Sequence, residues 1–209
     1  NQTESWNGTN WTAVATLNTA RQQLAGAGAD NTSALAFGGF NPPTYYANTE
    51  SWNGSSWTEV ADLNTARRDL GGNGIITSAL AYGGDTPGST AATESWNGSS
   101  WTDVADLNTA RRLAGAGTDN TNALGIGGET PGGASALTES WNGSIWTETS
   151  DLNTARQELG ATGASNSSAL AFGGSLNPPA VAFTEEWNAG INLGAWVTGG
   201  SMNTARQNL

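Results

Sequence analysis

The chain has 209 residues, enough for one large domain, and contains no run of 18 apolar residues that could cross a membrane as a helix. It contains no Cys, His or Lys, which excludes a disulfide framework, thiolate chemistry and catalysis by a histidine base. Its net charge of −11, from 18 acidic residues and 7 Arg, argues against a nucleic-acid partner, because the phosphates would be repelled.

The sequence repeats itself five times. Thr-Glu-Ser-Trp-Asn-Gly, or its decayed copy Thr-Glu-Glu-Trp-Asn, begins at Thr3, Thr49, Thr93, Thr138 and Thr184. The spacings are 46, 44, 45 and 46 residues, and Asn-Thr-Ala-Arg follows in every repeat. Such a period predicts stacked copies of one supersecondary unit, so we expect a single domain over residues 1–209. Because the chain starts inside a repeat and without Met, we expect it to be part of a longer chain.

The second repeat, residues 49–92, predicts four short strands. They are Thr49–Trp52, Trp57–Ala61, Leu70–Gly74 and Ser78–Tyr82. Residues 53–56, Asn-Gly-Ser-Ser, favour a tight turn between the first two, because Asn and Gly tolerate positive φ. Residues 62–67 form a connection, and no helical periodicity is present. Four strands in each unit of about 45 residues predict the blade of a β-propeller.

Two side-chain patterns predict positions within a blade. Segments rich in Ala and Gly fit the innermost strands, because blades converge on a channel where only small side chains fit. They are Leu24–Gly28, Ser33–Phe37 and Leu113–Gly117. All ten Trp fall at two repeat positions, where we expect them to fill the wider space between blades. A sugar-stacking platform is the alternative, but a Trp pair repeated in every blade favours core packing.

The repeats share glycine, tryptophan and arginine landmarks. A Gly-Gly pair ends the second strand in four repeats, an aromatic residue lies on the third, a Trp opens the fourth, and an Arg follows ten residues later. These features resemble the kelch repeat over essentially the whole chain, with Trp in place of the family's usual Tyr on the third strand. The resemblance implies an all-β, kelch-like β-propeller of four-stranded blades. The rival repeat, WD40, needs Gly-His and Trp-Asp dipeptides, which are absent.

Arrays of this style also look like kelch-like repeats in tail-fibre and other surface proteins of aquatic bacteriophages. That second resemblance is weaker, and it supports a location at a virion or extracellular surface more than it supports an activity.

The fifth repeat lacks its inner half. We count five outer hairpins of the Trp-Asn-Gly type but only four inner Ala/Gly hairpins, and residues 206–209 stand where a fifth inner pair would begin. A closed ring needs that pair, because an uncovered strand edge recruits partners. We therefore expect residues beyond Leu209, or a neighbouring chain, to supply it. We expect this segment not to close as an independent monomer.

One Glu and one Arg recur in every repeat, and we interpret them as structural ion pairs. They are Glu4, Glu50, Glu94, Glu139 and Glu185, with Arg21, Arg67, Arg111, Arg156 and Arg206. Catalysis by paired carboxylates needs two different environments, whereas these positions are equivalent. The sequence therefore predicts no catalytic residue and no enzyme activity.

Some turn residues have a second interpretation besides turn formation, either as glycosylation sites or as ligands of a metal ion. Four Asn-Gly turns are candidate glycosylation sites: Asn7, Asn53, Asn97 and Asn142. Asp30 and Asp119 offer oxygens in inner turns, but a Ca²⁺ site needs about six to eight ligands. A copper site like that of kelch-bearing oxidases would need the missing His and Cys. We expect no metal and no cofactor.

The blades differ most in the loop between their second and third strands. This loop comprises residues 40–48, 85–88, 129–132 and 175–179, and we expect it to share a face with the Asn-Thr-Ala-Arg connections. Variation on a rigid scaffold favours recognition, with loop drift as the alternative. The candidate binding residues are Phe40, Tyr45, Tyr46, Asp85 and Glu129.

These observations predict a non-enzymatic structural or adhesion module of a virion or extracellular surface assembly. The alternative is a glycan-binding lectin that uses interblade or loop pockets. We expect its partners to be other protein subunits or a cell-surface glycan or receptor. We expect no nucleic-acid partner and no membrane insertion.

Overall fold

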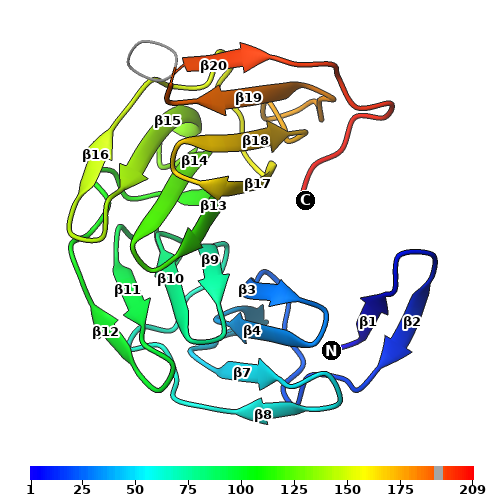
Figure 1. Ribbon diagram of the computed structural model, residues 1–209. Helices are drawn as coiled ribbons and strands as arrows, with labels where there is room; N and C mark the ends of the chain where they lie inside the picture. Colours follow the sequence, from blue (N-terminus) through cyan, green and yellow to red (C-terminus); the bar gives the residue numbers. More distant parts are fainter. Residues whose placement is uncertain (191–194) are drawn as a thin grey trace.

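The computed structural model describes residues 1–190 and 195–209, and in these ranges every helix or strand assigned is a β-strand. Four antiparallel, four-stranded sheets stand side by side around one centre (Figure 1). The described chain is therefore an all-β propeller with four complete blades, as the repeat period predicts.

Each blade runs in chain order from an innermost to an outermost strand. The first contains β3 (Ala25–Asp30), β4 (Ser33–Phe37), β7 (Thr49–Trp52) and β8 (Trp57–Glu59). The second contains β9 (Gly71–Ile75), β10 (Ser78–Tyr82), β11 (Thr93–Trp96) and β12 (Trp101–Asp103). The third contains β13 (Arg112–Asp119), β14 (Asn122–Thr130), β15 (Gly133–Trp141) and β16 (Trp146–Glu148). The fourth contains β17 (Gly160–Ser165), β18 (Ser168–Phe172), β19 (Thr184–Asn188) and β20 (Ala195–Thr198).

The innermost strands β3, β9, β13 and β17 line a common cavity whose wall consists mostly of Gly and Ala. Steric crowding explains this composition. A Cβ added at Gly72 would lie 2.9 Å from the Cβ of Ala25 and 2.8 Å from the ring of Phe37 in the neighbouring blade. The segment Ser33–Phe37 is the second strand, not an innermost one as expected. Its Leu35 and Phe37 are large and are buried in the core, away from the channel wall.

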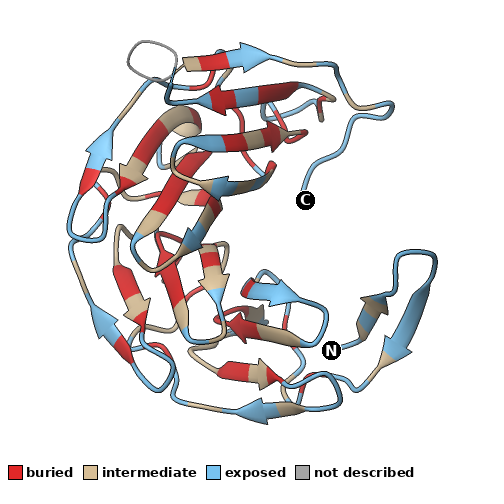
Figure 2. Ribbon diagram, in the orientation of Figure 1, coloured by how far each residue is buried: buried red, intermediate tan, exposed pale blue. Residues whose placement is uncertain are grey.

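The Trp residues of the outer hairpins fill the space between blades. The ring of Trp101 on β12 lies 5.0 Å from that of Phe37 on β4, edge to face, and its Nε1 donates to Thr49 Oγ1 at 3.0 Å. Tyr82 and Trp146 repeat the ring contact one blade further on. Buried residues accordingly occur in all four complete blades (Figure 2). These interblade contacts, not the sparse surface charges, form the core.

The first hairpin stands apart. Strands β1 (Thr3–Trp6) and β2 (Trp11–Val14) form a two-stranded sheet next to the first blade, and Figure 1 shows the ring open between this hairpin and the C-terminal residues. Trp57 Nε1 donates to Thr3 Oγ1 at 3.2 Å, which repeats the contact of Trp101 with Thr49. The hairpin therefore contacts the first blade in the way that β7–β8 contacts the second, and within the described residues it pairs with no inner strand.

Some predicted boundaries are shifted. Strand β8 ends at Glu59, before the predicted Ala61, since Asp62 Oδ1 turns back to accept the N–H of Thr49. The third strand predicted in the second repeat begins one residue late, at Gly71. In the third blade Glu129 belongs to β14, because β14 and β15 continue to a short turn at residues 131–132. The first blade has an additional small hairpin here, β5 (Phe40–Asn41) with β6 (Thr44–Tyr45).

Candidate functional site

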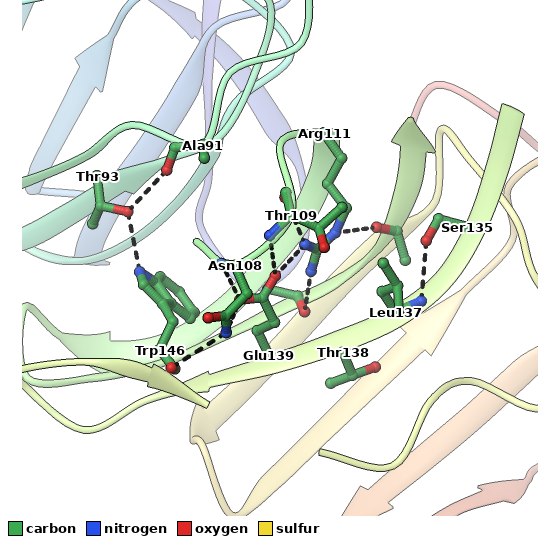
Figure 3. Close-up of polar contacts among 12 residues, drawn as sticks. Ala91, Thr93, Asn108, Thr109, Arg111, Ser135, Leu137, Thr138, Glu139 and Trp146 are labelled. Atoms are coloured by element: carbon green, nitrogen blue, oxygen red, sulfur yellow. Dashed lines mark hydrogen bonds and ion pairs between the residues drawn. The ribbon is translucent and has the colours of Figure 1, made fainter. Parts of the chain in front are cut away.

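The recurring Glu and Arg side chains lie where each connection enters the next blade. Figure 3 shows one example, in which Glu139 on β15 accepts an ion-paired hydrogen bond from Arg111. Glu139 also accepts from the backbone N–H of Asn108 at 2.7 Å and of Thr109 at 3.4 Å. Arg111 in turn donates to the carbonyl oxygens of Thr109, Gly125 and Gly127. The pair thus ties the Asn-Thr-Ala-Arg connection to the second and third strands.

Four such pairs are present. They join Arg21 to Glu50, Arg67 to Glu94, Arg111 to Glu139 and Arg156 to Glu185, with side chains at most 3% exposed. Buried in this way, the carboxylates cannot reach a substrate from solvent. The structure does not bring Glu4 and Arg206 together: both are exposed, and neither has an ion pair within the described ranges.

Burial acts on both members of a pair. It raises the pKa of Glu94, although the charge of Arg67 and two backbone N–H groups oppose the shift. It lowers the pKa of Arg67, against the attraction of Glu94. Each charge would therefore be costly to bury alone, which makes the pair a structural unit.

The variable loops share a face with the connections, as the hydrogen bond from Gly39 N to Arg67 O shows. On this face Phe40 and Tyr45 pack with their ring centroids 4.9 Å apart and their planes tilted by 56°. The guanidinium of Arg68 lies over both rings, 4.5 Å from the centroid of Phe40 and 5.4 Å from that of Tyr45. Its Nε is 2.9 Å from Asp85 Oδ2, which also accepts a 3.2 Å bond from the Tyr45 hydroxyl.

A second arginine extends this cluster to the third blade. Arg112 Nη1 lies 2.8 Å from Glu129 Oε2, and its Nη2 lies 3.5 Å from Asp85 Oδ2. Four of the five candidate residues are thus joined across three blades by Arg68 and Arg112. We call these six residues the two-arginine cluster: Phe40, Tyr45, Arg68, Asp85, Arg112 and Glu129. The fifth candidate, Tyr46, makes backbone bonds to Gly39 and Arg67.

Neither arginine was among the binding residues predicted from the sequence. The signal was present: the residue after Asn-Thr-Ala-Arg is a second Arg in two repeats and Gln in the other three. Charge that departs from the repeat consensus on a variable face is the kind of difference that recognition uses.

The cluster holds Asp85 as a carboxylate. Burial alone would raise the pKa of Asp85, but the hydrogen bond from Arg68, the charge of Arg112 and the bond from the Tyr45 hydroxyl together lower it below its ordinary value. Asp69 nearby behaves in the opposite way. Burial raises its pKa despite the charges of Arg112 and Arg68.

A cavity of about 180 Å³ lies beside the cluster. Its polar wall is formed by Gln23, Asp69, Arg112, Glu129, Gln157 and Glu158, and Leu side chains form much of the rest. Gln157 is only 8% exposed, yet its Oε1 accepts no hydrogen bond from the described residues. Arg112 Nε is likewise buried without an acceptor among them. Both atoms have almost no accessible surface, so the groups that the cavity offers to a ligand are the partly exposed side chains of Asp69, Arg112 and Glu129.

The remaining candidates are turn residues on the opposite face. Oδ1 of each Asn-Gly turn residue accepts two backbone N–H groups of its own turn: Asn7, Asn53, Asn97 and Asn142. Asp30 and Asp119 accept the N–H and hydroxyl of Thr32 and Thr121 in the same manner. Local turn geometry accounts for these oxygens. In residues 1–190 and 195–209, no three acidic, His or Cys side chains gather where they could hold a metal ion.

The chain matches no protein-family model and no curated protein, so its fold and its site are described from the structure alone. Across the two described ranges, no helix is long and apolar enough to span a bilayer.

Proposed function

We propose that this chain is a non-enzymatic, kelch-like β-propeller that serves as a structural or adhesion module of a virion or extracellular surface assembly. One contrast carries the proposal. The charges that recur in every blade are buried and hydrogen-bonded inside the frame, whereas the side chains that differ between blades gather in the two-arginine cluster on one face. A rigid frame with one variable face is the usual construction of a binding module.

The glycine pairs support the kelch-like repeat type. Both glycines of all four pairs adopt positive φ, as at Gly38 (69°) and Gly39 (114°). A Cβ at Gly38 would lie 2.7 Å from the carbonyl oxygen of Arg67, so the connection can pack there only against Gly. The glycine pair follows the second strand in the first, second and fourth blades and lies inside β14 in the third, and we infer that the outer hairpin β1–β2 belongs to a fifth repeat.

The proposal predicts that adhesion depends on the variable face. Binding of the full chain to a glycan array and to immobilised bacterial surface preparations should be measured for the parent and for Arg68→Ala combined with Arg112→Ala. The control is Ile145→Ser, an exposed residue of an Asn-Gly turn on the opposite face. Adhesion should fall in the double variant and persist in the control. Equal loss in both, or turnover of a bound glycan, would contradict the proposal.

A glycan-binding lectin is the second candidate, and the cavity beside the cluster favours it. Hydroxyls of a sugar in this cavity can donate to the carboxylates of Asp69 and Glu129 and accept from the guanidinium of Arg112, since these side chains line it and are 25% to 35% exposed. Replacement of Glu129 by Ala should then abolish binding to the glycans on the array. The matched control is Glu148→Ala, an exposed carboxylate on the outer strand β16. If no glycan binds and the chain assembles with concentration in sedimentation experiments, the structural role is supported.

A further inference from the structure

The C-terminal segment, residues 206–209, lies against the fourth blade in the same way as the connections between complete blades lie against the blades that they leave. Gly174 N donates to Arg206 O at 2.7 Å, as Gly39 N donates to Arg67 O at 2.8 Å. Leu209 packs on the same glycine pair: a Cβ added at Gly173 would lie 2.5 Å from Leu209 Cδ1. The backbone of this segment therefore repeats the geometry seen at the three connections between complete blades.

The side chain of Arg206 breaks the pattern. Each of the other four recurring arginines pairs with the Glu on the third strand of the blade that its connection enters. Arg206 is exposed, and no ion pair or hydrogen bond of its guanidinium is found within the described ranges. Glu4 on β1 is the recurring Glu left over, and it is exposed as well. In cyclic order, the partner of Arg206 is Glu4.

Strand β1 has one open edge. The equivalent strands β7, β11, β15 and β19 each lie between an inner and an outer neighbour, whereas β1 pairs only with β2. The two Trp of the β1–β2 hairpin are exposed as well, Trp6 by 43% and Trp11 by 65%. A strand edge flanked by uncovered aromatic rings favours strand addition.

We propose that the seam between β1 and Leu209 is a docking site for a two-stranded β-hairpin of this chain's own inner type. The hairpin pairs its second strand with β1 and brings Arg206 and Glu4 together as a fifth buried pair. The register can be specified: β4 pairs with β7, whose Thr49–Trp52 sequence is identical to Thr3–Trp6 of β1. A hairpin equivalent to β3–β4 therefore fits the open edge residue for residue.

The seam also defines the chemistry of its occupant. Inner strands approach their neighbours so closely that Gly and Ala are required, as the contacts around Gly72 show. The second strand of the hairpin must offer a central Leu and a large apolar residue two positions later, as Leu35 and Phe37 do in the first blade and Leu124 and Ile126 in the third. A second intact copy of the chain does not meet this requirement with a free hairpin, because the inner hairpins of its four complete blades are already paired.

The test uses the full 209-residue chain and a synthetic peptide with the sequence of residues 24–39. We expect saturable one-to-one binding by calorimetry, a blue shift of Trp fluorescence as the exposed rings are covered, and a higher melting temperature. A peptide with Asp at the position of Leu35 is the control and should not bind.

The ion pair is tested by Glu4→Gln and Arg206→Gln. Neither side chain has an ion pair with any of the described residues, so both variants should melt like the parent. Each should weaken peptide binding about tenfold, which corresponds to about 1.4 kcal/mol. The double variant should lose little more than either single one, since both remove the same contact. Glu148→Gln, an exposed carboxylate on β16, is the matched control.

Three results would overturn the inference. The first is absence of binding at millimolar peptide. The second is equal peptide affinity in the parent, Glu4→Gln and Arg206→Gln. The third is self-association of the chain through β1 without peptide, which would make a second copy the occupant of the seam.

Discussion

The hexapeptide Thr-Glu-Ser-Trp-Asn-Gly occupies two very different regions, β1 at the open seam and β11 inside the second blade. Locally the two copies are alike. Trp6 pairs with Trp11, and Trp96 with Trp101, in the same register, with ring centroids 5.6 Å and 5.3 Å apart and the same 44° tilt. Their surroundings differ: Trp96 is 1% exposed and Trp101 5%, against 43% and 65% for Trp6 and Trp11.

This comparison separates what the repeat sequence specifies from what the fold adds. The sequence alone is enough for the hairpin and its Trp pair, because identical residues give identical local geometry. Burial of the same rings depends on inner strands and a neighbouring blade. A fully buried Trp contributes up to about 4–6 kcal/mol of transfer free energy, so most of the stability arises at this second level.

The largest difference in the free energy of unfolding should come from removing one Trp ring in the second blade and one in the β1–β2 hairpin. Trp101→Ala deletes the contact with Phe37 and the bond to Thr49, and it should lower the free energy of unfolding by about 5 kcal/mol. Trp11→Ala should have a small effect, because its ring is mostly exposed already. Denaturant unfolding measures both. Similar losses at the two sites would mean that the seam is closed in solution.

The next largest difference in stability is expected between the buried Glu94 and the exposed Glu4. Glu94→Ala strands the buried guanidinium of Arg67 and should cost about 3–5 kcal/mol. The equivalent Glu4→Ala should leave the melting temperature unchanged, because Glu4 is exposed and unpaired among the described residues. A clear loss on Glu4→Ala, measured by calorimetry, would show that Glu4 already has a partner.

Bulky substitutions on the channel wall should destabilise a strand that lies between two inner strands more than one that lies next to the seam. Ala116 lies on β13, between β9 and β17, whereas Ala27 lies on β3, next to the seam. Ala116→Trp should therefore destabilise the protein by overpacking, by about 1–3 kcal/mol or more, and Ala27→Trp by less. If both variants melt like the parent, these strands do not enclose a narrow channel.

The features that could be predicted from the sequence are mostly those that recur in every repeat, whereas those that could not depend on contacts between particular repeats. Strand Ser78–Tyr82, the Asn-Gly turns and the interblade role of Trp could be read from period and composition, since each copy confirms the others. The two-arginine cluster could not, because it joins side chains about one repeat apart in sequence, such as Tyr45 and Asp85. Nor could the positive φ of Asp69, which lines the cavity beside the two-arginine cluster and lies where no Gly marks the turn.

The smallest expected effect contrasts two carboxylates of the variable face. The folded pKa of Asp85 lies below its ordinary value, so ionised Asp85 stabilises the fold above that value, and this contribution is lost as the pH falls through the folded pKa. The folded pKa of Asp69 is raised, so its contribution to the free energy of unfolding is favourable at low pH and is lost as the pH rises through the folded pKa.

At pH 7, Asp85→Asn should therefore destabilise the protein by about 1 kcal/mol or less, and this loss of stability should shrink at pH values below the ordinary pKa range of Asp. Asp69→Asn should be neutral or slightly stabilising at pH 7, helped by the tolerance of Asn for positive φ. Melting temperatures of the parent and both variants across this pH range decide the matter, and equal losses for the two at pH 7 would contradict the opposite roles assigned to them.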